Sequence, residues 1–214
     1  MNMKRFWIGF LLLVVVFSGC AGARYGFWLF TDPEIKKVKA EFAGLEDHSV
    51  AVVIYADERL QLDYPNVRLT LGSQIVNQLR ENVKKIRVIN PLRVARYQDE
   101  NLYWDTQDKR KTAKDLKVDY VLLVSLLEFN TRVPGQMNAY QGRISAEVKL
   151  YSGSKEETQN CVWKTEDALE VVYPDLAQYS PRTEPVIRRE TEKRFADMLA
   201  KKFYNHKVKV EKEK

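Results

Sequence analysis

The chain has 214 residues, of which 45% are hydrophobic, 30% charged and 11% aromatic, and its formal charge is +6. This apolar fraction supports one packed domain and excludes a wholly disordered chain. The two cysteines exclude a disulfide scaffold, and the two histidines argue against a His-based zinc or catalytic site.

The first twenty residues, MNMKRFWIGFLLLVVVFSGC, have the organisation of an export signal. A basic start, Lys4-Arg5, precedes the apolar stretch 7–17, which has the length of a signal core but is too short to cross a bilayer. The run Phe17-Ser18-Gly19-Cys20 resembles the lipobox of bacterial lipoprotein signals, with Phe17 in place of the usual Leu. The resemblance implies cleavage of residues 1–19 and a diacylglycerol thioether on Cys20, whose acyl chains anchor the protein in a membrane as palmitate-type lipid. A plain secretory signal with an incidental cysteine is the alternative.

The residues around Cys20 bear on localisation and on redox state. Ala21 and Gly22 follow it, and under the sorting rule of enterobacterial lipoproteins the lack of Asp there implies the outer membrane, facing the periplasm. Inner-membrane anchoring is the alternative. If Cys20 is acylated, Cys161 has no partner within the chain, and we interpret it as a small buried apolar residue in a strand.

Residues 20–47 form an anchor-proximal segment. Its aromatic cluster at 25–30 either lies among lipid headgroups or folds back onto the domain. Asp32-Pro33 is a good helix start, and apolar residues then recur every three or four positions. This pattern predicts a short amphipathic helix over about 33–43 that presents Ile35, Val38 and Phe42.

The domain proper is predicted over 48–205, followed by a solvated charged tail, 206–214. Its first half is predicted to contain a buried strand at 49–56, a polar loop to 65, a helix at about 66–82, a strand at 86–90 and a short helix near 92–97. A loop at 101–107, a basic helix at 108–116 and a core strand at 118–130 follow. The last part is predicted to contain a half-exposed strand at 140–151, a partner strand at 160–173 that is irregular near Asp167-Ala168, a loop at 174–183, and a helix opened by Pro185. Strands joined by helices pair in parallel through right-handed crossovers. The fold class is therefore α/β: a single-domain mixed β-sheet with helices packed on it, ending in an antiparallel meander and a C-terminal helix.

On that last helix, Arg188, Arg189, Lys193 and Arg194 alternate with Glu190 and Glu192, which predicts an outer face laced with salt bridges.

Several phrases of this pattern resemble the curli-secretion-channel-like superfamily of envelope lipoproteins, which includes lipoprotein activators of penicillin-binding proteins and GNA-type periplasmic lipoproteins. The phrases are the strand at 50–53, the strand at 87–90, the run DLKVDYVL at 115–122 and the strand end EVKLY at 147–151. The chain departs from the family where Lys117 stands at a common Gly and where Tyr151-Ser152 replaces Leu/Val-Asp. The chain also offers no hairpins for a pore, so neither channel activity nor any catalytic residue is carried over.

A partner surface is predicted from two neighbouring groups of side chains. The aromatic group lies in a weakly patterned segment and is suited to anchor a protein partner, the alternative being a cover for one end of the core; it comprises Tyr97, Tyr103 and Trp104. The basic group suits anionic headgroups or a glycan, the alternative being a solvated helix face; it comprises Lys109, Arg110 and Lys111, with Lys114 behind them. In an exported protein we expect no nucleic-acid partner.

We expect no enzyme, no catalytic residues, no cofactor and no metal. The chain lacks the serine-hydrolase, phosphate-loop, dinucleotide, zinc-protease and CxxC motifs. The best acidic candidate, Asp57, Glu58 and Asp63 after the first strand, is better interpreted as a solvated loop. The function predicted is that of a non-enzymatic adaptor or assembly factor for envelope proteins. The alternative is a ring-forming component of a secretion or transport assembly, associating through the half-exposed strand 140–151.

Overall fold

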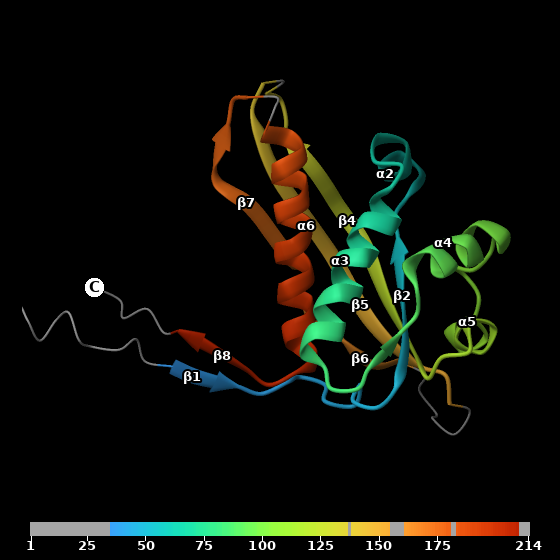
Figure 1. Cartoon of the computed structure of the whole chain (residues 1–214). Coiled ribbons are helices and arrows are strands. Elements are labelled where there is room, and N and C mark those ends of the chain that lie inside the picture. The colour runs from blue at the N-terminus through green and yellow to red at the C-terminus, as the bar shows by residue number, and fades with distance from the viewer. Residues whose placement is uncertain (1–34, 137, 155–160, 181–182, 210–214) are drawn as a thin grey trace, which may run out of the picture. The chain divides into compact units, whose positions relative to one another are not determined.

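The computed structural model describes residues 35–136, 138–154, 161–180 and 183–209 (Figure 1). They fall in two compact units: a large one, residues 39–206, and a small one that holds β1 (Ile35–Val38) and most of β8 (His206–Lys209). The predicted signal peptide, Cys20 and the aromatic cluster at 25–30 lie outside the described residues. Among those that are described, no helix is both long and apolar enough to cross a membrane.

The large unit is built on a six-stranded mixed sheet. Its strands, in spatial order, are β3 (Arg87–Val88), β2 (Ser49–Tyr55), β4 (Tyr120–Arg132), β5 (Tyr140–Ser152) and, sharing the last edge, β6 (Cys161–Lys164) and β7 (Leu169–Gln178). β2 is parallel to both of its neighbours, and the later pairs are antiparallel. β6 and β7 are two halves of one interrupted edge strand, with the break at 165–168. These features confirm the predicted α/β mixed sheet, its meander and the irregularity near Asp167.

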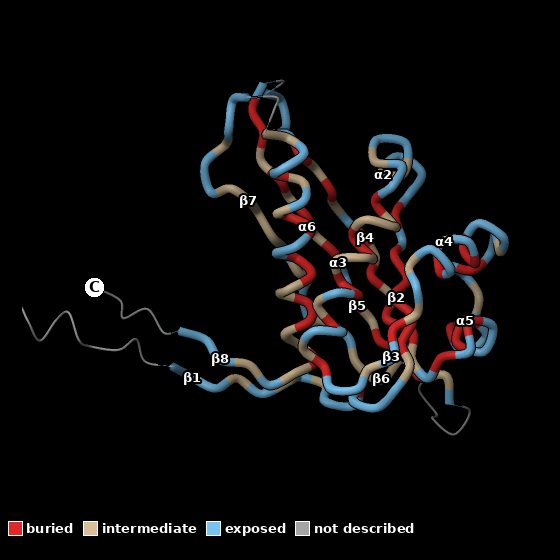
Figure 2. Tube along the Cα trace, viewed as in Figure 1, coloured by how far each residue is buried: buried red, intermediate tan, exposed pale blue. Residues whose placement is uncertain are grey.

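Helices cover the two faces of this sheet unequally (Figure 1). α3 (Val67–Asn82) and α6 (Glu184–Ala200) pack on one face, and α4 (Pro91–Glu100) and α5 (Lys109–Leu116) on the other. The one-turn-and-a-half helix α2 (Glu58–Asp63) leads into α3, and the 3-10 turn η2 (Lys201–Phe203) follows α6. Figure 2 shows the buried positions concentrated where α3 and α6 face β2, β4 and β5. The larger of two apolar clusters lies there.

A bulge in β4 changes which residues face α3 and α6. Leu122, Val124 and Leu126 alternate onto that face, but Phe129 continues the series after an interval of three. The pairing with β5 shifts between Leu126 and Glu128, which leaves Leu127 as the extra residue of the bulge. Leu127 is therefore turned out to solvent and is 57% exposed.

The predicted helix over 33–43 is wrong for the residues that the structure describes. Ile35–Val38 form strand β1, which pairs with β8 in a two-stranded sheet. The same pairing orders His206–Lys209 as strand β8, so the charged tail predicted from 206 is exposed as expected but begins as a strand. Local apolar spacing pointed to a helix, whereas the hydrogen bonds come from a strand about 170 residues away in the chain, so tertiary pairing overrides local pattern.

Two loops contain structure that we did not predict. The loop after the first strand holds α2, because Asp57 Oδ1 accepts a hydrogen bond from Leu60 N at 2.7 Å and caps the helix. The loop predicted at 174–183 begins later, since β7 continues through Pro174 to Gln178. Pro174 lies in an edge strand, where its missing N–H breaks no sheet pairing.

β5 alternates between buried and partly exposed residues as predicted, but it is not an unpaired edge at which copies of the chain could associate. It pairs with β4 along one side and with β6 and β7 along the other, so it lies inside the sheet. Its alternating residues Ile144, Ala146, Val148 and Leu150 are buried. The outer strand β7 carries Pro174 and the charged Asp175, both of which discourage edge-to-edge pairing. The route through strand 140–151 to a ring is therefore closed by pairing.

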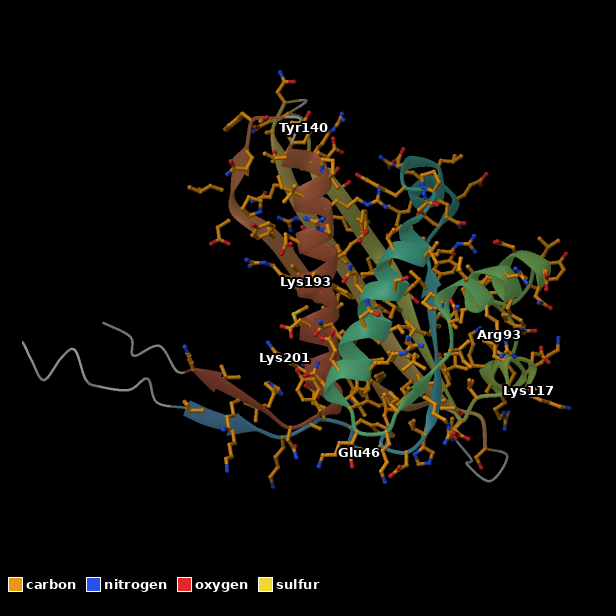
Figure 3. All side chains as sticks on the ribbon, viewed as in Figure 1. Glu46, Arg93, Lys117, Tyr140, Lys193 and Lys201 are labelled. Atoms are coloured by element: carbon orange, nitrogen blue, oxygen red, sulfur yellow. The ribbon has the colours of Figure 1, made fainter. Side chains whose placement is uncertain are left out.

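α6 also departs from the predicted outer face of salt bridges. Glu192 is 3% exposed and accepts a hydrogen bond from Thr70 Oγ1 at 2.8 Å on α3. The Arg188 guanidinium pairs with Glu192 at 3.3 Å and lies over the rings of Tyr64 and Phe129. Burial raises the pKa of Glu192, and the hydrogen bond from Thr70 and the charge of Arg188 oppose that shift. The pair thus joins α6 to α3 inside the fold. Lys193, on the same helix and labelled in Figure 3, is exposed.

Candidate partner-binding surface

The helices that connect the parallel strands run over opposite faces of the sheet, which leaves the carboxyl end of β2 accessible as a candidate site. β2 pairs with β3 on one side and β4 on the other, and α3 follows it over one face. α4 and α5 precede β4 over the opposite face. In open α/β sheets, ligands bind outside the carboxyl ends of the strands, at the point where the connections from two neighbouring strands run to opposite faces of the sheet. In this protein that point lies beside Tyr55, the last residue of β2.

Side chains on the α4/α5 face form rows across β2, β4 and β5, and their exposure rises from row to row. The rows, set by the strand register, are Ala51, Val121 and Tyr151; then Val53, Leu123 and Lys149; then Tyr55, Ser125 and Glu147. Ala51 and Val121 are 0% exposed, whereas Tyr55 is 37% exposed. Further along β4, Leu127 is more exposed still. The cover provided by α4 and α5 therefore ends between the second and third rows.

A cavity of about 200 Å³ lies at the edge of that cover. Its walls are Tyr55, Trp104, Asp105, Leu123 and Ser125. The rings of Tyr55 and Trp104 are tilted to each other with centroids 6.1 Å apart, so they form the aromatic wall. The cavity combines apolar walls with a carboxylate and two hydroxyls, and it is smaller than the pockets that hold whole small-molecule ligands.

The loop between α4 and α5 holds two large apolar side chains out to solvent next to this cavity. Leu102 is 82% exposed and Tyr103 is 79% exposed, and both directly precede Trp104. Trp104 is buried, so it fixes the loop while its two neighbours stay outside. We use the name partner surface for Tyr55, Leu102, Tyr103, Leu123 and Leu127.

Lys109 is the internal brace of this loop. Its Nζ donates to the carbonyl oxygens of Trp104 at 2.9 Å, Asp105 at 2.6 Å and Gln107 at 3.0 Å, which uses all three ammonium protons. Burial lowers the pKa of Lys109, and the nearby Asp105 and Asp108 carboxylates oppose that shift. Three carbonyls held by one buried cation give the loop a defined conformation.

Side chains of α4 tie this brace to the sheet. Gln98 Nε2 donates to the carbonyl of Ile54 at 2.9 Å, next to the carboxyl end of β2. Arg93 Nη2 donates to the carbonyl of Leu116 at 3.3 Å and joins α4 to the end of α5; Arg93 and Lys117 are labelled on this side of the molecule in Figure 3. Tyr97 is buried among α4 and α5 and contacts Gln107 through its hydroxyl. The loop is therefore a rigid platform rather than a free tether.

The structure divides the predicted partner residues into two groups. Tyr97, Trp104 and Lys109 are buried, so they cover one end of the core and do not offer a surface, which corrects our prediction for these three. Tyr103 is exposed as predicted. Arg110 and Lys111 are also exposed, Arg110 in an ion pair with Asp108 at 2.7 Å that raises its pKa, chiefly through the side-chain hydrogen bond.

Four residues of the partner surface were not predicted from the sequence: Tyr55, Leu102, Leu123 and Leu127. Leu102 was available as a signal, since an apolar residue beside Tyr103 in a polar loop is unusual. The other three belong to strands whose apolar residues seemed to need burial. Their exposure depends on where α4 and α5 stop, which local sequence does not report.

Beyond the partner surface, the same face of the sheet is charged. Arg143 on β5 pairs with Glu170 on β7 and lies 3.9 Å from Glu128 on β4. Lys149 pairs with Glu147 at 3.5 Å along β5. These pairs border the apolar patch with solvated polar side chains, which is the arrangement of core and rim found in protein interfaces.

A second group of polar residues meets at the opposite end of β2. Asp119 Oδ2 accepts hydrogen bonds from Ser49 N and Ser49 Oγ, both at 2.7 Å, and Arg87 lies 3.8 Å away. The Ser49 hydrogen bond leads the causes that lower the pKa of Asp119, against an opposing effect of burial. His48 Nδ1 donates to the Glu46 carbonyl at 2.7 Å, whereas the Ser49 hydroxyl donates to Asp119. A hydroxyl that donates to a weakly basic carboxylate is not activated as a nucleophile.

The Asp119 group is therefore a clamp between the starts of two parallel strands. Asp119 itself lines a cavity of about 320 Å³. Lys117, two residues before Asp119, has a left-handed backbone with φ of 58° as the C-cap of α5, a conformation that Gly adopts most readily.

The acidic residues after β2 serve α2. Asp57 caps its N-terminus, Glu58 lies in its first turn and Asp63 ends it, and all three are exposed. In the part of the chain that the structure describes, no three His, Cys, Asp or Glu side chains come together in a way that would hold a metal ion. Cys161, predicted to be buried, is half-buried in β6, with its Sγ 3.6 Å from the carbonyl oxygen of Trp163.

Comparisons with known proteins give no close relative. No family model matches the chain, and no curated protein matches its sequence. Among solved structures, a PelC dodecamer from Paraburkholderia phytofirmans has a TM-score of 0.44 at 12% identity, covering 80% of this chain and 99% of that one. The lipoprotein GNA1162 from Neisseria meningitidis has a TM-score of 0.41 at 12% identity, covering 70% of this chain and 98% of that one. Likenesses this distant transfer no function or assembly to this chain.

Proposed function

We propose that this protein is a lipid-anchored envelope lipoprotein that binds another envelope protein through the partner surface and has no catalytic step of its own. The anchor is assigned to Cys20 on the signal-like sequence before it, with the outer membrane, facing the periplasm, as its place and the inner membrane as the alternative. An anchor keeps the domain near membrane-bound partners and raises its effective concentration toward them.

The observation that carries the adaptor role is the exposure of Leu102 and Tyr103 on a braced loop. Large apolar side chains held outward by a rigid frame lose little conformational freedom on binding, and aromatic anchors next to a pocket are typical of the most important contact residues in interfaces. The neighbouring cavity beneath Tyr55 and Trp104 supplies a place for a partner side chain.

Affinity capture from chemically crosslinked envelopes tests this role with a matched pair of variants. L102S/Y103S removes the two exposed apolar side chains of the partner surface. L176S/Y179S is the control, because Leu176 and Tyr179 are 79% and 73% exposed on and just after β7. We expect the wild type and the control to recover the same specific protein, and L102S/Y103S to lose it.

Three results would contradict the adaptor role. They are recovery of the same protein by both variants, repeated recovery of no specific protein, and recovery of copies of this chain alone, which would favour the ring-forming alternative. Thermal unfolding of each variant checks that both retain the fold.

Metabolic labelling tests the anchor separately. Radiolabelled palmitate should enter the wild-type chain, and C20S should abolish the label and release the protein from the membrane fraction. Unlabelled wild-type protein, or unchanged fractionation of C20S, would remove the anchor from the proposal.

A further inference from the structure

The small unit carries a concentrated positive charge. Its two strands, β1 and β8, have the sequences IKKV and HKVK, and neither contains an acidic residue. Lys36, Lys37, Lys207 and Lys209 are all exposed. We call these two strands with their four lysines the basic ribbon. Within the described residues, no ion pair neutralises any of the four lysines.

The basic ribbon differs from the other basic surface of the chain. On α5, Arg110 is paired with Asp108, and Lys111 donates to Gln107 Oε1 at 3.1 Å. Lys109 is buried as a brace. The four lysines of the ribbon are thus gathered, exposed, on one two-stranded sheet, whereas the basic side chains at the start of α5 are partly engaged by their neighbours.

The ribbon is also tied in sequence to the proposed anchor. Only 14 residues separate Cys20 from Ile35, so at about 3.5 Å per residue the intervening chain spans at most roughly 50 Å. A basic segment close to a lipid anchor supplies the second of the two signals that stable membrane attachment requires. Exposed apolar side chains, Ile35 and Val208, accompany the lysines and suit an interfacial position.

We propose that the basic ribbon binds the phosphate groups of anionic phospholipids in the membrane that holds the anchor. This inference rests on the proposed lipid anchor and adds a second, electrostatic attachment to it. Each lysine near an anionic surface strengthens attachment by about fivefold, and the effect decays within a Debye length and weakens with salt.

Acetylation footprinting on the full mature protein tests the ribbon without any substitution. The protein is reconstituted into phosphatidylcholine vesicles with or without phosphatidylglycerol, floated, treated with an acetylating reagent at low and high salt, and analysed by mass spectrometry. We expect Lys36, Lys37, Lys207 and Lys209 to be acetylated at least several-fold more slowly with phosphatidylglycerol at low salt, and equally in all other conditions. Lys111 and Lys114 on α5 are internal controls and should not change.

The other outcomes overturn the inference in distinguishable ways. Equal acetylation of the ribbon lysines in both vesicles refutes the ribbon while leaving the anchor intact. Protection of Lys111 and Lys114 instead assigns the headgroup contact to α5. Protection that does not depend on phosphatidylglycerol or salt means that something other than anionic headgroups covers the ribbon. Protein that floats with neither vesicle refutes the anchor and the ribbon together.

Discussion

The two faces of the central sheet are covered by helices of different length, and the difference separates the face that holds the fold together from the face that we propose binds a partner. α3 and α6 have 16 and 17 residues, so each spans about 25 Å, whereas α4 and α5 have 10 and 8 residues and span about 15 and 12 Å. β4, with 13 residues, is about 43 Å long. The long pair buries its face of the sheet, and the short pair leaves the carboxyl end of β2 and the second half of β4 open.

The comparison explains why the same strand carries both core and surface leucines. On β4, Leu122 is 0% exposed under α3 and α6, and Leu127 is 57% exposed on the other face. Hydrophobic burial on one face holds the fold together, so the apolar residues on the open face are free to serve a partner.

Truncation to alanine should lower the free energy of unfolding far more at Leu122 than at Leu127. L122A removes a fully buried side chain and should lower the free energy of unfolding by about 2–5 kcal/mol. L127A removes an exposed one and should change it by less than about 0.5 kcal/mol. Urea unfolding measures both, and similar losses in the two variants would refute the distinction between the faces.

Gly142 on β5 has no side chain, which allows α6 to pack close to the sheet. A Cβ at this position would lie 1.9 Å from Thr191 Oγ1, so G142A should cost about 1–3 kcal/mol of stability as α6 is pushed away. T191A removes that oxygen and leaves the Thr191 Cβ 2.9 Å away, so the double variant should recover part of the loss. Thermal unfolding of the single and double variants measures this coupling, and strictly additive losses would contradict it.

The clamp that Asp119 forms with Ser49 should contribute less to the free energy of unfolding, and that contribution should depend on pH. D119A removes the acceptor of two hydrogen bonds from Ser49, and because the carboxylate is about half exposed we expect a cost of about 1–2 kcal/mol near neutral pH. A lowered pKa in the fold means that the stabilisation is full above the ordinary value of 3.8 and is lost as the pH falls through the folded value.

The cost of D119A should therefore shrink in acid. E147A, which removes an exposed carboxylate paired with Lys149, is the control and should have little effect at any pH. A cost of D119A that stays constant down to strongly acidic pH would show that its charge plays no part.

The smallest effect on the free energy of unfolding is expected for substitution of the buried Glu192, and its pH dependence is opposite in sign to that of Asp119. Burial raises the pKa of Glu192 in the fold, so its contribution is most favourable below the ordinary value of 4.5 and is lost as the pH rises through the folded value. Unfolding of wild type and E192Q across this range should show the wild type losing stability relative to the variant as pH rises. A difference that is independent of pH would contradict the raised pKa.

Sequence patterns were sufficient for the elements whose environment is local or uniformly apolar. Helix α5 begins after the N-cap Asp108, whose side chain accepts from Arg110 N, and the buried strands β2 and β4 follow from their apolar runs. The resembling phrase at 115–122 contains Asp119, and its role as a strand clamp emerged only with Ser49 opposite it.

The partner surface was only partly predictable because it depends on distances between elements. Trp104 and Tyr103 are neighbours of similar character, yet one is buried and the other exposed, since the loop turns around the ammonium of Lys109. A lysine in a basic run gives no sign that it donates to three carbonyls. The bulge at Leu127 and the pairing of β1 with β8 are likewise set by strands distant in sequence.

Site-specific photocrosslinking in intact cells tests the central claim most directly. A photoreactive amino acid is placed at Tyr103 on the partner surface and, as the matched position, at Tyr179. We predict a light-dependent adduct of one defined mass from position 103 and none from position 179. The absence of an adduct at 103, or the same adducts from both positions, would contradict the account that the open part of the sheet face binds a partner.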